Sequence, residues 1–479
     1  MNGYTIEKKF LTLGLIFGLL LVFLVPPLQA PDEDSHFKKS FLVSSFHLFP
    51  ERSPEGVVGN YIPQSIVDFD NKLRYLMGNM DARYLYKDQY IDSHTKVNRG
   101  SETFIEYSTS RSNPVLFLPQ AFGMFLLKVT IDNPLINSNN DLSPINYIYA
   151  GRIFNLLFFL LCCYYSIKII PFMKNTLFLL CLMPMTITLA SSLSYDSVII
   201  GSLFLFISGI LKLSYSDNVE KIDTKYLYYM VIFSVVLIHF KQVYYPLLFL
   251  FLLIPSHKFK SKKEKCKWFV ISIVSGVISF LVWSFFTKML LGVDNISTDT
   301  NSMDQLKFIL TSPIEYILIL IKTLIVNLKF YLIGFIGNLG WLDTNFPYLF
   351  ILMYCILLIV TVLFDRGESR DNINIKEKGF ITSIGILIIV LMETALYITW
   401  TSKSEIGGVG FGLISGVQGR YFIPISIIVL LLFKINTTRY NEKFDKFSNV
   451  MTFLIPKISI FSLTYTMIIL LLRYWIPSP

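Results

Sequence analysis

The sequence predicts an all-α integral membrane protein with roughly 11 to 13 transmembrane helices. Of its 479 residues, 53% are hydrophobic, and the mean hydropathy is +0.56. Apolar runs of roughly 20 residues, long enough to cross about 30 Å of hydrocarbon, recur along most of the chain. The net charge of +9 comes from basic residues concentrated in short loops. This pattern is typical of a protein in a lipid bilayer and is not a nucleic-acid signal.

The first apolar run, Phe10–Val25, ends at Pro26-Pro27 without a clean small-residue cleavage site. We therefore expect a retained first helix within residues 1–28 and not a cleaved signal peptide. Lys8 and Lys9 precede this helix. Their charge places the N-terminus inside and the residues after the helix outside.

Residues 29–113, called the first loop below, form a polar segment whose acidic and basic residues nearly balance. Its aromatic content argues against a disordered tail. We expect short amphipathic helices that lie on the membrane or on the helix bundle. The clearest is Ser65–Met80, whose apolar face carries Ile66, Phe69, Leu73, Leu76 and Met77.

Residues 114–479 are expected to form a multi-helix transmembrane domain. The apolar segment from Asn113 to Val129 is short for a span and suits a re-entrant or interfacial position. The expected spans that follow are Ile145–Ile170, Leu177–Ala190, Val198–Leu213, Tyr226–Phe240, Val243–Ile254, Lys267–Leu290, Ile314–Ile336, Tyr348–Phe364, Phe380–Trp400, Tyr421–Phe433 and Phe453–Arg473.

The loop His257–Lys267 contains six lysines against one glutamate, which places it on the cytoplasmic side. The same bias puts both Val293–Asp304 and Trp341–Asp343 outside. The run between them must then cross twice, re-enter, or begin as an interfacial helix around Gln305–Ile317. The five cysteines lie in expected helices or in the lysine-rich loop, so the sequence predicts neither a disulfide framework nor a Cys/His metal site.

Three consecutive carboxylates, Asp32, Glu33 and Asp34, and the nearby His36 follow the first helix directly. Such groups are costly to leave unsolvated beside a membrane. One interpretation is a proline stop followed by a helix cap. The other is a catalytic site. The sequence identifies no cofactor, and a divalent cation stays open, with ligands from the cluster Asp32–His36.

Three further charged residues lie near the ends of expected spans. Asp196 lies at an outer turn and is either the N-cap of the next helix or part of a site. Lys241 lies outside against the positive-inside bias and either snorkels or binds an anion such as phosphate. Arg152 opens a long helix and is able to pair with a carboxylate.

A late segment combines glycines, an arginine and aromatic residues at the outer face. It runs through Gln418-Gly419-Arg420-Tyr421. Glycine lets a backbone approach a ligand closely, and an arginine fork suits bidentate binding of phosphate. The alternative is an interfacial Arg-Tyr anchor for the next helix. The turn with Trp341 and Asp343 adds an aromatic residue and a carboxylate on the same side.

Together these residues give the outer face both carboxylates and cations. A reaction between a lipid-linked phosphate and a hydroxyl acceptor needs this combination. One carboxylate acts as general base on the hydroxyl, and the cations stabilise the charge that builds on the phosphate leaving group.

The elements Pro31–His36, Gly340–Asp343 and Gln418–Pro424 resemble, in order and topology, the DUF2142 family of bacterial multi-pass membrane proteins. That family is similar in layout to the GT-C glycosyltransferases, whose catalytic acid lies in the first external loop. The resemblance implies a GT-C-like arrangement of helices with Asp32 or Glu33 as base. Candidate ligands of the donor phosphate are Arg420, Lys241 and His36. Candidate substrate-binding residues are Gln418, Tyr421, Trp341, Asp343, Asp196 and Arg152.

The resemblance further implies a transferase of the bacterial cytoplasmic membrane whose active site faces away from the cytoplasm. The donor would be a polyprenyl-phosphate sugar, and the acceptor a cell-wall glycopolymer, either a polysaccharide or a teichoic acid. Two alternatives stay open. A polymerase or ligase would work on similar lipid-linked saccharides, and a flippase or exporter would transport them.

Overall fold

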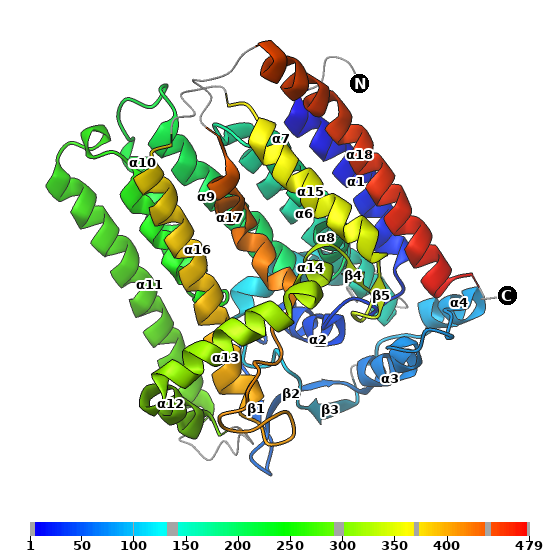
Figure 1. Cartoon of the computed structure of the whole chain (residues 1–479). Coiled ribbons are helices and arrows are strands. Elements are labelled where there is room, and N and C mark those ends of the chain that lie inside the picture. Colours follow the sequence, from blue (N-terminus) through cyan, green and yellow to red (C-terminus); the bar gives the residue numbers. More distant parts are fainter. Residues whose placement is uncertain are drawn as a thin grey trace.

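The computed structural model describes residues 5–98, 100–131, 142–291, 301–367, 373–435 and 442–476. These residues are predominantly α-helical, which confirms the predicted fold class. Long helices lie side by side in a bundle, and the first loop covers one end of it (Figure 1).

Five helices among the described residues are long and apolar enough to cross a membrane, or six if one bent pair counts as a single span. They include α6 (Pro144–Ile169), α9 (Asp196–Tyr215) and α11 (Lys262–Leu291). The other two are α16 (Ile375–Leu396) with its π-helical end η5 (Tyr397–Thr401), and α18 (Glu442–Tyr474). This is fewer than the 11 to 13 spans expected, because other apolar runs are divided into shorter helices.

Prolines account for several of these divisions, because proline lacks a backbone N–H and clashes with the preceding turn. Pro184 separates α7 from α8, Pro246 lies inside η3, and Pro424 lies inside η6. The shorter elements of the bundle are α1 (Ile6–Leu24), η2 (Pro114–Phe117), α5 (Leu118–Thr130), α7 (Lys174–Cys181), α8 (Pro184–Ala190), α10 (Thr224–Leu237), η3 (Gln242–Leu253), η4 (Ser256–Lys258), α15 (Tyr348–Phe364), η6 (Gly419–Ile425), α17 (Ser426–Leu430) and η7 (Leu431–Phe433).

The first loop folds into short helices and a small antiparallel sheet of strand order β1-β2-β3. Its elements are α2 (Glu33–Val43), β1 (Glu51–Arg52), β2 (Val58–Pro63), α3 (Gln64–Leu73), η1 (Arg74–Leu76), α4 (Tyr86–His94) and β3 (Glu102–Ile105). Ile66, Phe69, Leu73 and Leu76 are buried, as the amphipathic pattern predicts. They share an apolar cluster with Ile148 of α6, so these helices lie on the bundle.

The sequence leaves several topologies open for the apolar run that precedes the Trp341–Asp343 turn. In the structure this run is bent by 107° between α12 (Ser302–Thr311) and α13 (Pro313–Val326). It continues through α14 (Leu328–Ile336) into the hairpin β4 (Asn338–Leu339) and β5 (Thr344–Asn345). All these elements lie at the end of the bundle that carries the first loop (Figure 1). The expected span Ile314–Ile336 is thus divided between α13 and α14, and the bent pair of α12 and α13 has the geometry of a broken span or a re-entrant segment. Residues 292–300 of the preceding segment lie outside the described residues.

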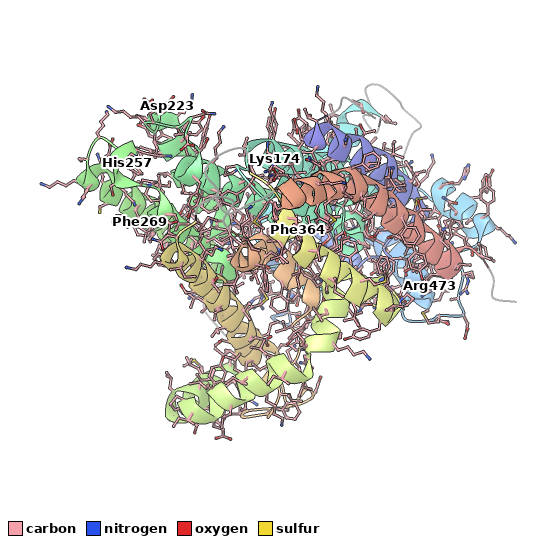
Figure 2. The ribbon with its side chains drawn as sticks, turned by 45° about the horizontal axis from the view of Figure 1, so that its top comes forward. Lys174, Asp223, His257, Phe269, Phe364 and Arg473 are labelled. Atoms are coloured by element: carbon pink, nitrogen blue, oxygen red, sulfur yellow. The ribbon has the colours of Figure 1, made fainter. Side chains whose placement is uncertain are left out.

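The lysine-rich loop His257–Lys267 and the first loop lie at different ends of the bundle (Figure 1). Lys174, Asp223 and His257 lie in the upper part of the molecule in Figure 2, and Arg473 lies at its right-hand side. The loops that precede α10 and α11 are at the end of the bundle opposite the first loop (Figure 1). Helix α11 is at the side of the bundle, with 11% of its apolar window buried.

Candidate functional site

The turn between α1 and α2 fixes the three carboxylates in different directions. Asp32 is the N-cap residue of α2 and has a left-handed backbone with φ of 59°. This conformation costs on the order of 1 kcal/mol or more for a residue with a side chain, although Asp tolerates it better than most. The Asp32 side chain makes no capping hydrogen bond. Its carboxylate is thus not accounted for by the helix-cap interpretation.

Glu33 points into the bundle and is fully buried against Arg152 of α6. Arg152 donates to the two carboxylate oxygens of Glu33 at 2.8 and 2.7 Å. Its other N–H groups donate to the carbonyls of Val22, Val25 and Pro26 at 2.7 to 2.9 Å. All five N–H donors of Arg152 are therefore used. The pair fixes the end of α1 onto α6 and leaves neither partner free for a substrate.

Asp32 turns the other way and begins a line of alternating charges, called the charge row below. Arg420 donates to the Asp32 carboxylate at 2.5 Å. The Nε atom of Arg420 lies 3.5 Å from a carboxylate oxygen of Asp196. Lys241 donates to the other oxygen of Asp196 at 3.0 Å. The row therefore joins four of the residues predicted to form the site, from α2, η6, α9 and the turn before η3.

The side chains at the two ends of the charge row are partly exposed to solvent, whereas the two in the middle are buried. The Asp32 side chain is 48% exposed, whereas that of Arg420 is 2% exposed. The Asp196 side chain is 9% exposed and that of Lys241 is 25% exposed. A molecule from solvent or from the membrane surface is therefore able to reach Asp32 directly. It reaches Arg420 only by way of its neighbours.

Arg420 differs from Arg152 in how many of its donors are used. Within the described part of the chain, Arg420 makes one hydrogen bond, and its Nε and Nη1 atoms have no hydrogen-bond partner although they are buried. Buried arginine donors without acceptors are costly. An oxyanion bound beside Arg420 would satisfy them.

Aromatic rings enclose the cations and His36. The Lys241 ammonium lies 3.7 Å from the centre of the Tyr421 ring and 5.4 Å from that of Tyr195. The His36 ring lies 4.5 Å from that of Tyr195 and 5.9 Å from that of Phe117. Tyr195 was not singled out in the sequence, where its position directly before Asp196 was the available signal.

The charges and burial around α2 set the ionisation of Asp32 and His36. Burial raises the pKa of Asp32, but the charges of Arg420 and His36 and the hydrogen bond from Arg420 together outweigh it, so this pKa lies below its ordinary value of 3.8. Burial, aided by the charge of Arg420, lowers the pKa of His36 below its ordinary value of 6.5 in spite of the opposing charges of Asp32, Asp196 and Asp34. At neutral pH, Asp32 is thus a carboxylate and His36 is uncharged. His36 offers a hydrogen bond to a phosphate and no positive charge.

The other predicted site residues hold the first loop in place. Asp343 accepts from Arg473 at 2.9 Å and from the backbone N–H of Gly78 at 3.2 Å. The Trp341 indole donates to the carbonyl of Leu28 at 2.8 Å. These bonds direct the Gly337–Asp343 turn toward the first loop. Gln418 lies two residues before Arg420, and its side-chain oxygen is buried without a partner among the described residues.

Asp34, the third acid of the cluster, faces Lys38 at 3.4 Å and Arg74 at 4.0 Å. The three consecutive carboxylates therefore meet three different sets of cations. Within the described residues no group of three or more potential ligands is arranged to hold a metal ion. The cluster of Asp32, Glu33 and Asp34 does not fit a divalent cation, and no step below uses one.

The packing of η6 on α14 positions Arg420. A Cβ atom on Gly419 would lie 2.0 Å from the carbonyl oxygen of Tyr331 and 2.4 Å from the backbone nitrogen of Phe335. Only glycine fits this approach of two backbones. Beside it, a cavity of about 370 Å³ runs along η6, α17 and η7 from Phe422 to Phe433 and is lined almost entirely by apolar side chains. We call it the apolar groove.

The bundle and the charge row together define a multi-pass α-helical membrane protein with a buried polar site at one end. A family model described as "Predicted membrane protein (DUF2142)" matches residues 15–429. The chain belongs to this family. No curated protein and no solved structure matches it.

Proposed function

We propose that this protein is a GT-C-type glycosyltransferase of the bacterial cytoplasmic membrane. It moves a sugar from a polyprenyl-phosphate donor to a cell-wall glycopolymer, a polysaccharide or teichoic acid, on the face away from the cytoplasm. The observation that carries the proposal is the charge row. A half-exposed carboxylate, Asp32, lies against a buried arginine, Arg420, whose donors are mostly unused. The transfer needs a base next to an anion site.

The donor has a phosphate and a long apolar chain, and both find matching surroundings. The apolar groove begins at Phe422, two residues after Arg420, and suits the polyprenyl chain. The phosphate then lies at Arg420, where the unpartnered Nε and Nη1 atoms donate to its oxygens. Lys241 adds positive charge from the opposite side of Asp196.

In the reaction, Asp32 accepts the proton of the acceptor hydroxyl as its oxygen forms a bond to C1 of the sugar. The bond from C1 to the phosphate oxygen breaks, and polyprenyl phosphate leaves with the electron pair. Arg420 and Lys241 stabilise the negative charge on this leaving group. Donor binding also activates the base. Once the phosphate takes over Arg420, Asp32 loses the attraction that lowers its pKa and accepts a proton more readily.

Glu33 and Arg152 are positioning residues in this scheme. They are completely buried and mutually satisfied, so they hold the turn that presents Asp32. Trp341 and Asp343 act similarly, by fixing the first loop. Of the two acids proposed as base from the sequence, the geometry therefore favours Asp32.

The test is a transfer assay on the full-length protein in lipid nanodiscs, with cell-wall fragments and polyprenyl-phosphate sugars. Asp32→Asn is expected to abolish transfer while donor binding is retained. Asp34→Asn is the matched control, because Asp34 is two residues away and paired with Lys38. Equal turnover by wild type and Asp32→Asn would refute the assignment of the base.

Lipid analysis of cells that lack the protein separates the alternatives. Accumulation of a polyprenyl-monophosphate sugar, with loss of one sugar from the wall polymer, is expected for the transferase. Accumulation of polyprenyl-pyrophosphate oligosaccharide would instead identify a polymerase, ligase or exporter.

A further inference from the structure

A second cavity, of about 450 Å³, lies between the first loop and α11. It meets the charge row at Lys241. Arg52 of β1, Arg111 of the first loop and Lys288 of α11 also line it. We call it the basic cavity. The first loop, the turn before η3 and α11 thus all supply cations to this cavity. No sequence pattern indicates that these segments meet.

Three cations of the basic cavity, Arg52, Arg111 and Lys288, have no counter-charge among the residues that the structure describes, whereas Lys241 pairs with Asp196. None of the described residues that line it is acidic. Among the residues that the structure describes, no carboxylate lies within 4.0 Å of Arg52, Arg111 or Lys288. The Nε atom of Arg52 is buried without a hydrogen-bond partner in the described part of the chain. Like charges that face one cavity repel, and a bound anion relieves this repulsion.

Aromatic rings line the same space. Trp283 and Phe280 of α11 face the cavity. Trp283 stacks on Phe49 of the first loop, with ring centres 5.0 Å apart and planes at 17°. This stack fixes α11 against the first loop. Aromatic faces pack against the C–H faces of sugar rings, and arginine and lysine bind phosphate. The combination matches a sugar chain that carries phosphate groups.

We propose that the basic cavity binds a phosphodiester-bearing segment of the acceptor, so that the acceptor is an anionic glycopolymer. This inference rests on the proposed function and narrows its substrate class. The donor phosphate is already accounted for by Arg420 next to the apolar groove. Lys241 belongs to both the basic cavity and the charge row. An acceptor held in the basic cavity therefore ends next to the residues that carry out transfer.

Binding is measured first, with the full-length protein in nanodiscs and no donor present. The probes are an oligomer of glycerol phosphate and an uncharged glucose hexasaccharide. The variants are Arg111→Gln, Lys288→Gln and their combination, since both side chains are exposed and their loss leaves the core intact. Lys87→Gln is the control, because Lys87 is an exposed lysine of α4, at the far side of the first loop from β1 (Figure 1).

We expect each single variant to weaken binding of the glycerol phosphate oligomer about tenfold, and the combination about a hundredfold, if each loses one charged contact. The control and the uncharged probe should show no such change. Wild-type protein that fails to bind the oligomer would overturn the proposal. So would variants that bind the oligomer normally and the polyprenyl-phosphate donor weakly, since the cavity would then serve the donor.

Transfer kinetics separate this inference from the proposed function. In the transfer assay the variants should raise the KM for the phosphodiester acceptor and leave kcat and the donor KM unchanged. If wild type transfers no sugar but the combined variant still loses oligomer binding, the proposed function fails and the anion site stands. If wild type transfers sugar to neutral and phosphodiester acceptors with equal KM, the anion site fails and the transferase stands.

Discussion

Arg420 donates to Asp32 at 2.5 Å, although 388 positions separate the two residues in the chain. The pair joins the acidic motif after α1 to the Gly-Arg-Tyr motif at the start of η6. One partner is half exposed and the other is buried. The exposed acid is thus held in place by an arginine that solvent does not reach. A bound phosphate is able to compete for that arginine.

Replacing Arg420 with lysine tests whether its fork binds the donor phosphate. Lysine keeps the charge but cannot donate to two phosphate oxygens in one plane. We expect Arg420→Lys to weaken binding of the polyprenyl-phosphate sugar by about tenfold or more, in a binding assay without acceptor. Arg74→Gln serves as control, because Arg74 is 55% exposed and pairs with Asp70. Unchanged donor affinity in Arg420→Lys would exclude bidentate binding at this residue.

Glu33→Gln is expected to act on stability more than on chemistry. Removing one charge from a fully buried pair leaves Arg152 uncompensated, which typically costs about 3–5 kcal/mol. The thermal unfolding midpoint and the yield of inserted protein should fall. Asp32→Asn should lower both by less, because Asp32 is half exposed and Arg420 keeps its ion pair with Asp196. A Glu33→Gln protein that unfolds at the wild-type temperature but transfers no sugar would instead make Glu33 the base.

Gly419→Ala probes the packing that positions Arg420. The added methyl group would meet backbone atoms of Tyr331 and Phe335 well inside contact distance, so η6 or α14 has to shift. We expect more than a tenfold loss of transfer, because displacement of a site residue by about 1 Å costs up to a hundredfold in rate. Gly209→Ala in α9 is the control, since a Cβ there meets no atom within 4 Å. Wild-type transfer by Gly419→Ala would show that this approach does not fix the site.

The sequence alone predicts the fold class and the main residues of the site, because hydropathy and charge position are local signals. It does not separate Asp32 from Glu33. These neighbours point in opposite directions from one turn, and only the distant partners Arg152 and Arg420 reveal which one is buried.

The features that sequence reasoning missed depend on contacts between distant segments. Arg52, Arg111 and Lys288 share a cavity without any common motif. The sheet of the first loop has strands of two to six residues, too short for a clear alternation of apolar and polar residues. The bend of 107° after α12 divides an apolar run whose hydropathy alone suggests a straight span.

His36 should make the stability of the protein depend on pH between its lowered pKa and 6.5. In that window the unfolded chain binds a proton that the folded chain excludes, so stability is complete above pH 6.5 and declines as pH falls. The groups that act on the ring are Asp32, Asp34 and Asp196, which favour its protonation, and Arg420, which opposes it. Burial and Arg420 together outweigh the three acids, and this difference sets the direction of the effect.

Thermal unfolding of wild type, His36→Phe and His94→Gln in nanodiscs between pH 7.5 and 5.5 measures this dependence. One such group changes the free energy of unfolding by at most about 1.4 kcal/mol per pH unit. Phenylalanine keeps an aromatic ring between Phe117 and Tyr195 and cannot take up a proton. His36→Phe should therefore lose less stability on acidification than wild type, whereas His94→Gln, which removes an exposed histidine, is the control and should follow wild type. Equal slopes for wild type and His36→Phe would mean that His36 does not resist protonation in the folded protein.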